Sequence, residues 1–134
     1  MNKLLLVDDS APLRRIMSRV VRDSELDLDD IVEADSLASA TALARKDTSV
    51  GVVLADMGTA GTGGVELVRS LRRDRARGDL AIVAVINPGD ADTAAAAMAA
   101  GADAHVARPF TSSTIRAVIE SVSGTRADGR RIAS

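Results

Sequence analysis

Three aspartates in this sequence stand where carboxylates could do chemistry together. Asp8 and Asp9 follow the apolar run over residues 4–7, and Asp56 comes after a second apolar run over 52–54. If these runs are neighbouring parallel strands, their carboxyl ends meet at one edge of a sheet and the three carboxylates converge. Clustered anions raise one another's pKa unless a cation neutralises them, and Mg2+ prefers such oxygen ligands. The spacing therefore predicts a magnesium site that could also shield an incoming phosphate.

Each aspartate also has a purely structural interpretation. Asp8 and Asp9 could cap the helix that follows them, because carboxylates favour the positive end of a helix dipole. Asp56 could be an ordinary turn residue at the end of a strand. The occurrence of both features at strand ends that should adjoin favours the functional interpretation.

The glycine-rich segment after Asp56 raises the alternative of a phosphate-binding loop. Such a loop requires GxxxxGK[ST], but Gly64 is followed by Val65 and Glu66 and not by lysine. A dinucleotide-binding fingerprint would have to follow the first strand, where the sequence has Val-Asp-Asp. Nucleotide binding is therefore disfavoured, and the glycines are better explained by a tight turn beside a small site.

A parallel sheet is needed to bring these carboxylates together, and the apolar pattern predicts one. Continuous apolar runs over 4–7, 52–54 and 81–86 are typical of strands covered on both faces, and weaker strands are expected at 31–32 and 104–106. Helical periodicity separates the runs. The residues that form the apolar helical stripes are Leu13, Ile16, Met17, Val20 and Val21, then Val65, Val68 and Leu71, then Ile115, Val118, Ile119 and Val122.

Helix boundaries are indicated by a few residues. Pro12 suits a first helical turn, and Ser36 suits the N-cap of a helix through about Arg45. In the first helix, the positions between the apolar residues are predicted to face water, namely Arg14, Arg15, Ser18 and Arg22.

The alternation of strands and helices predicts a flavodoxin-like, doubly wound α/β fold. Five parallel strands would follow the order 2-1-3-4-5, with helices on both faces. The helix predicted over 90–103 is rich in alanine, so we expect either a loosely held, partner-stabilised surface or an ordinary helix lying on the sheet. Residues 124–134 lose the periodicity, and we expect a disordered tail there.

Composition limits the possible classes of function. A chain of 134 residues that is 46% hydrophobic forms one domain. The formal charge of -2 gives no electrostatic reason to expect binding to nucleic acid or to an anionic membrane. The absence of cysteine excludes disulfides and thiolate metal sites, and the short apolar run at the N-terminus does not fit a signal peptide. We therefore expect a cytoplasmic protein.

Charge is unevenly distributed along the chain. Residues 23–35 carry seven acidic side chains and no basic one. Five arginines gather around the end of the helix predicted after the glycines, namely Arg69, Arg72, Arg73, Arg75 and Arg77. Opposite patches could orient a partner, but solvated faces explain the same pattern.

Three segments together resemble the receiver domain of two-component response regulators over about residues 1–123: LLLVDDS, VVLAD with the later GGVELVRSLR, and AGADAHVARPF. The resemblance implies that Asp56 accepts a phosphoryl group from a histidine kinase or a phosphotransfer protein while Mg2+ is bound. It also implies that Asp8, Asp9, Asp56 and the backbone carbonyl of Gly58 hold the metal.

A receiver of this kind would be a stand-alone response regulator that signals through protein contacts and is not an enzyme with turnover. By the same resemblance, a downstream protein would read the face formed by the helix over 90–103, the strand over 104–106 and the last helix. A homodimer is also possible.

Several positions depart from the family pattern. Arg108 stands where the family has lysine, and the bond from Arg108 to Pro109 is expected to be cis, as this bond commonly is in the family. Ile86 stands where receivers keep a threonine or serine that follows the phosphoryl group, and a shift of one residue would place Asn87 there instead. His105 replaces the usual switching tyrosine or phenylalanine.

These departures, together with Thr59-Ala60 where the family has Met-Pro, leave two other functions open. One is a pseudo-receiver that serves as a docking module without phosphotransfer. The other is a small Mg2+-dependent phosphohydrolase with an aspartyl intermediate, which is disfavoured because Gly58, and not an acid, stands two residues after Asp56.

Overall fold

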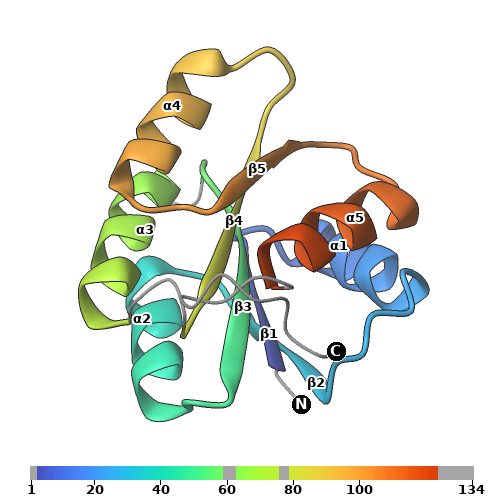
Figure 1. The fold of residues 1–134 in the computed structure, drawn as a ribbon, viewed down its shortest axis with the longest axis horizontal. Coiled ribbons are helices and arrows are strands. Elements are labelled where there is room, and N and C mark those ends of the chain that lie inside the picture. Colours follow the sequence, from blue (N-terminus) through green and yellow to red (C-terminus); the bar gives the residue numbers. More distant parts are fainter. Residues whose placement is uncertain (1–2, 59–62, 76–78, 124–134) are drawn as a thin grey trace.

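The computed structural model describes residues 3–58, 63–75 and 79–123, and Figure 1 shows their arrangement. Three sequence predictions fall outside these ranges: the disordered tail over 124–134, the Thr59-Ala60 departure and the place of Arg77. Among the described residues, no helix is long and apolar enough to cross a membrane.

Five parallel strands form one sheet in the order β2-β1-β3-β4-β5, as the sequence predicted. Val7 of the first strand lies opposite Ala55 of the third, so the residues that follow them, Asp8 and Asp56, leave the sheet side by side. The strands span Lys3–Val7 (β1), Asp30–Ala34 (β2), Val50–Asp56 (β3), Ala81–Ile86 (β4) and Ala104–Ala107 (β5).

Five helices cover both faces of the sheet, which confirms the predicted fold class. They span Ala11–Asp23 (α1), Leu37–Lys46 (α2), Gly63–Asp74 (α3), Ala91–Ala100 (α4) and Ser112–Ser123 (α5). In Figure 1, α2, α3 and α4 lie on one side of the strands and α1 and α5 on the other. Ser36 caps α2 by accepting a hydrogen bond from the Ser39 amide, and Pro12 lies in the first turn of α1, both as predicted.

The core is aliphatic and divided by the sheet. Leu5 and Val7 point into the cluster under α2, α3 and α4, whereas Leu4 and Leu6 point into the cluster under α1 and α5. Burying a leucine of this kind contributes about 1.5–3 kcal/mol, so these alternating strand residues dominate the stability of the frame that holds the site.

The predicted orientation of α1 was wrong in its first turns. Leu13 and Ile16 are 37% and 59% exposed, whereas Ser18, which was predicted to face water, is buried. Arg14 is partly buried and forms an ion pair with Glu33. The helix starts at the carboxyl edge of the sheet, so its first turns lie beside the residues that follow β5 and not over the strands. Helical periodicity predicts which face of a helix is apolar, but it does not show how much of that face packs against the sheet.

Helix α4 is held by little apolar surface, in agreement with its alanine content. Only Ala94 and Ala97 of this helix are buried, and Met98 is exposed. The helix is shorter than the predicted 90–103: Asp90 caps its beginning, and Gly101, with φ of 124°, ends it in a conformation that favours glycine.

Candidate functional site

Two of the three predicted aspartates are buried side by side at the carboxyl edge of the sheet. Asp56 is the last residue of β3 and is 4% exposed, and Asp8 directly follows β1 and is 1% exposed. Asp9, the next residue, is exposed. The prediction that parallel strands bring the carboxylates together therefore holds for this pair.

The helix-capping interpretation does not account for Asp8 or Asp9, because Ser10 is the N-cap of α1. Its side chain accepts a hydrogen bond from the Leu13 amide at 3.3 Å. Asp8 instead uses Oδ1 to accept from the Ser10 amide at 2.8 Å. Its other oxygen, Oδ2, is buried and has no hydrogen-bond partner among the described residues. Asp8 thus presents an acceptor atom that the fold itself does not use.

Arg108 brings positive charge to this pair of carboxylates. Its Nη1 lies 2.9 Å from Asp56 Oδ1 and 3.7 Å from Asp8 Oδ2. Its Nη2 donates a hydrogen bond to Asn87 Oδ1 at 3.1 Å. The peptide bond from Arg108 to Pro109 is cis, as expected. The arginine that departs from the family pattern therefore reaches the predicted acceptor.

Burial disfavours the charged form of both carboxylates. It raises the pKa of Asp56, and the neighbouring Asp8 raises that pKa further, whereas Arg108 and the Gly58 amide oppose the shift. Burial also raises the pKa of Asp8, against the hydrogen bond from Ser10 and the charge of Arg108. Additional positive charge at this edge would therefore be favourable.

The fit of a metal ion can be tested on these atoms. The unused Asp8 Oδ2 and the nearby Asp56 carboxylate are oxygen donors of the kind Mg2+ takes. The described part of the chain contains no group of three acidic, histidine or cysteine side chains arranged to hold a metal ion. The protein thus offers Mg2+ two converging side chains, and the remaining ligands would be waters and a backbone carbonyl, an arrangement that Mg2+ tolerates.

The candidate switch residues lie around this centre. Ile86 is the last residue of β4, and its side chain is buried in the core, where it offers no hydroxyl. Asn87 follows it and is exposed, with its amide oxygen held by Arg108. His105 is exposed on β5. Gly58 is exposed, and its backbone amide donates a hydrogen bond to Asp56, whereas the sequence interpretation had assigned a role only to its carbonyl.

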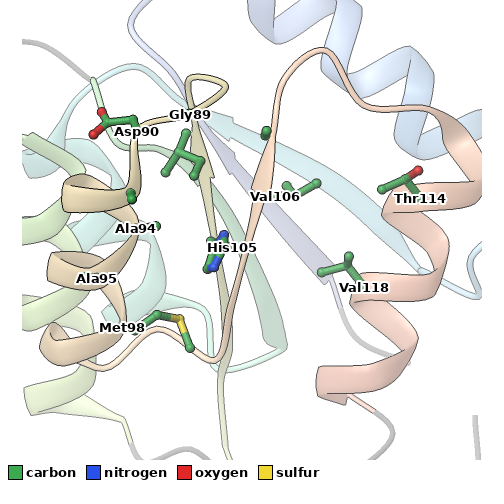
Figure 2. Close-up of a pocket in the computed structure, with 12 residues that line it drawn as sticks. Gly89, Asp90, Ala94, Ala95, Met98, His105, Val106, Thr114 and Val118 are labelled. Carbon is green, nitrogen blue, oxygen red and sulfur yellow. The ribbon is translucent and has the colours of Figure 1, made fainter.

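An open groove of about 730 Å3 lies between α4, β5 and α5. Figure 2 shows His105 at its centre, with Met98 from α4 on one side and Val118 from α5 on the other. Small side chains form much of its wall, including Ala94 and Ala95. This is the face that the sequence resemblance assigned to a downstream partner.

A smaller apolar cleft adjoins Arg108, and the sequence interpretation missed it. Its volume is about 250 Å3, and its lining comes from α1 and from the segment after β5, namely Leu13, Ile16, Met17, Val20, Arg108, Pro109 and Phe110. A signal was present in the sequence: the only aromatic residue of the chain, Phe110, comes two positions after Arg108. Grouped apolar side chains that are exposed indicate a contact surface.

Comparison with known proteins places this geometry in a family. The family model for the response regulator receiver domain matches residues 4–120. A chemotaxis protein CheY homolog of Campylobacter jejuni is 32% identical over 123 residues, which is 92% of this chain and 93% of that protein. Chemotaxis protein CheY1 of Helicobacter pylori is 28% identical over 123 residues, covering 92% of this chain and 98% of the relative.

Solved structures show the same fold. A response regulator receiver domain protein from Clostridium thermocellum superposes with a TM-score of 0.79 at 20% identity, over 91% of this chain and 94% of that one. The chemotaxis response regulator CheY4 of Vibrio cholerae gives 0.77 at 24% identity, over 91% and 98% of the two chains. With the matching family model and the relatives in sequence, these findings lead to one conclusion: the chain belongs to the response regulator receiver domain family.

Proposed function

We propose that Asp56 is the phosphoryl acceptor of this receiver domain and that its phosphorylation controls contacts with other proteins. One observation carries the proposal: Asp56 is a buried carboxylate at the carboxyl edge of the sheet, with a guanidinium nitrogen of Arg108 at 2.9 Å. Phosphorylation on an aspartate is typical of the family, and Asp56 is the aspartate at the end of β3.

The reaction is a covalent transfer between two proteins. A carboxylate oxygen of Asp56 attacks the phosphorus of a phosphohistidine on a histidine kinase or phosphotransfer protein. The new P–O bond forms as the P–N bond breaks, and the ring nitrogen leaves with the electron pair. Most of the assistance comes from in-line positioning and from neutralising charge, because the phosphoryl group passes through a loose transition state.

The residues around Asp56 have separate tasks in this proposal. Asp8, Asp56 and the Gly58 carbonyl would hold Mg2+, with Asp9 nearby, and the ion would supply positive charge to the transferring oxygens. Arg108 supplies a second, permanent positive charge, from a nitrogen that lies against both the Asp56 and the Asp8 carboxylates. Its planar fork can donate two parallel hydrogen bonds, which the compact ammonium of a lysine cannot do.

The exposed cleft beside Arg108 supports an approach route for the donor. Leu13 and Ile16 line a cleft with Arg108, which itself contacts Asp56, and they offer apolar surface on which a partner can dock while its phosphohistidine reaches Asp56. The groove between α4, β5 and α5 is a separate surface, and we assign it to the downstream protein. Donor and target would thus meet different faces of the domain.

A docking module without phosphotransfer is the second candidate. The observation that favours it is the position of Ile86, which is buried and carries no hydroxyl to follow a phosphoryl group. A phosphate-ester hydrolase is less well supported, because the receiver family is a signalling family.

Intact mass spectrometry tests the acceptor directly. The protein is incubated with Mg2+ and acetyl phosphate, and the same reaction is run with Asp56→Asn and with a metal chelator. We expect the mass of one phosphoryl group to appear in the wild type and to be absent from both controls. An unchanged mass in folded wild type, with acetyl phosphate and with a cognate kinase, would leave the docking module as the better explanation.

A further inference from the structure

The two ends of the Arg108 guanidinium contact different parts of the protein. Nη1 faces the acceptor Asp56 at 2.9 Å, and Nη2 donates to Asn87 at 3.1 Å. Asn87 is the first residue after β4, in the segment that leads to α4. One side chain therefore joins the phosphorylation site to the beginning of that segment.

The two ends are not equally well bonded. Nη2 makes a hydrogen bond, whereas Nη1 is buried and makes none among the described residues, despite its short distance to the Asp56 carboxylate. The guanidinium is thus held with an N–H misdirected relative to the carboxylate. Because arginine has no acceptor atom, the group of Asn87 that meets it must be the amide oxygen.

A phosphoryl group on Asp56 would change this balance. It replaces the single negative charge of the carboxylate with a phosphoryl group that carries up to two, and it places strong acceptor oxygens next to Nη1. The guanidinium is positively charged, so it is attracted more strongly to the negatively charged phosphoryl oxygens than to the neutral amide oxygen of Asn87, and the phosphoryl oxygens outcompete Asn87. Arg108 then turns towards the phosphoryl group and releases Asn87.

We propose that Asn87 is the positioning residue for Arg108 and that the Arg108–Asn87 hydrogen bond reports the state of Asp56 to the segment between β4 and α4. This inference rests on the proposed phosphorylation of Asp56. It gives the chain a way to couple the acceptor to its surroundings although Ile86 has no hydroxyl. The segment continues into Gly89 and Asp90, which line the groove beneath α4, so the released end lies next to the surface assigned to the target.

The sequence makes the contact unusually easy to observe. Asn87 is one of two asparagines, the other being Asn2, and the chain contains no glutamine. The 15N–1H spectrum of the labelled protein therefore holds two side-chain amide pairs, and Asn87→Ala identifies the pair of interest. The pair from Asn2 serves as an internal reference.

The first measurement is made on the unphosphorylated protein. Replacing Arg108 with lysine removes the second arm of the fork, so we expect the Asn87 amide pair to move in Arg108→Lys while the Asn2 pair stays in place. An Asn87 pair at the same position in both proteins would show that the contact does not exist in solution and would overturn the inference, whatever happens at Asp56.

The second measurement follows phosphorylation. Mg2+ and acetyl phosphate are added, and intact mass is recorded on the same sample. In wild type that carries the phosphoryl group, we expect the Asn87 pair to shift, and in equally phosphorylated Arg108→Lys we expect this shift to be lost. If the Asn87 side-chain amide signals do not shift in phosphorylated wild type, the proposal is wrong. A sample that never gains the mass refutes the proposed function instead, and the first measurement still decides the resting contact.

The rate of phosphoryl uptake in variants of Asn87 and Arg108 distinguishes a positioning role of Asn87 from a merely structural one. Asn87→Ala should change the rate of phosphoryl uptake by at least about threefold when Arg108 is present and have less effect when lysine replaces it, the behaviour of coupled residues. Asn87→Gln keeps a neutral amide oxygen and should restore a rate closer to that of wild type. Equal effects of Asn87→Ala in both backgrounds would contradict a role exerted through Arg108.

Discussion

Two partly buried arginines lie at opposite edges of the sheet, and they are bonded in opposite ways. Arg72 of α3 donates to the backbone carbonyls of Gly101 and Leu80 and forms an ion pair with Asp103 at 2.8 Å. Arg108, at the carboxyl edge, has one hydrogen bond to a neutral amide and a nitrogen that faces two carboxylates without completing a hydrogen bond. A fully bonded arginine fixes a structure, whereas an incompletely bonded one can respond to a ligand.

The partners of Arg72 show what it fixes. Asp103 also accepts a hydrogen bond from the amide of Ile82 at 2.8 Å, so Arg72 and Asp103 together join α3, the first residues of β4 and the end of α4. This junction sets the spacing of the elements on that side of the sheet. The site at the other edge can then change its bonding while the frame stays in place.

Removing Arg72 should cause the largest loss of stability. Arg72→Ala removes the cationic partner of the Asp103 carboxylate and one donor from each of two carbonyls, and breaking such a partly buried pair costs about 3 kcal/mol in the free energy of unfolding. Chemical denaturation measures it. The matched control is Arg69→Ala, because Arg69 is exposed and its ion pair among the described residues is with Glu66 of its own helix, so a change within about 0.5 kcal/mol is expected. Similar losses for both variants would show that the junction is not special.

Removing Arg108 should cost less, and the loss should depend on pH. Arg108→Met keeps the bulk but withdraws the charge from two buried carboxylates, so we expect a loss of about 1.5 kcal/mol at neutral pH. Lowering the pH protonates those carboxylates and removes the repulsion, so the difference from wild type should shrink. A loss that is the same at every pH would mean that Arg108 contributes by packing and not by charge.

Removing the charge of Asp56, the proposed acceptor, should stabilise the fold. The raised pKa of Asp56 means that its charged form is disfavoured in the folded state. We therefore expect Asp56→Asn to unfold at a higher denaturant concentration than wild type at neutral pH. A destabilised Asp56→Asn would show that the ion pair with Arg108 outweighs the burial of the carboxylate.

The pH dependence of stability follows from the same shifts. For Asp8 and Asp56 the folded pKa lies above the unfolded value, so the folded protein binds protons more tightly. Their contribution to stability increases as pH falls from above the raised pKa values towards about 3.9, the ordinary value for aspartate. Asp47 acts in the opposite sense, because its bonds to Lys3 and Ser49 lower its pKa to about 2 and that stability is lost as pH falls through this value. Denaturation curves recorded at several pH values give the free energy of unfolding as a function of pH. In the range above about pH 3.9, this free energy should change less steeply with pH in Asp56→Asn than in wild type.

The smallest effect on stability is expected at the exposed apolar cleft. Ile16→Ser changes a side chain that is 59% exposed, so the free energy of unfolding should stay within about 0.5 kcal/mol of wild type. Transfer from a protein donor should slow, whereas phosphorylation by acetyl phosphate should not. Unchanged transfer from a cognate protein donor would place the donor's docking surface elsewhere.

The order of the strands could be predicted from the sequence, whereas individual side-chain contacts could not. Strand order and the pairing of Asp8 with Asp56 follow from apolar runs and from the geometry of parallel sheets, and both are confirmed. The exposed start of α1 could not be predicted, because periodicity gives a direction and not the extent of the cover. The contact of Arg108 with Asn87 depends on the reach of one long side chain, which no spacing rule describes.

The positions of charged residues in the sequence did not show which of them are exposed. Arg72 was grouped with four neighbouring arginines as part of a basic patch, yet it faces inward and is neutralised by Asp103, whereas Arg69 and Arg73 are exposed. The acidic residues over 23–35, in contrast, are all exposed, as a solvated face requires. Whether a charge belongs to a surface or to a junction is decided by tertiary packing.

The anchoring of α4 has a mechanical consequence. Its C-terminal end is pinned where Arg72 holds the Gly101 carbonyl, its middle rests on two methyl groups, and its N-terminal end continues from the segment that begins at Asn87. A helix that is held at one end and packs through few side chains along its length tilts most easily about the held end. A small displacement at Asn87 is therefore resisted weakly, and the tilt it produces is largest next to the mouth of the groove, at Asp90.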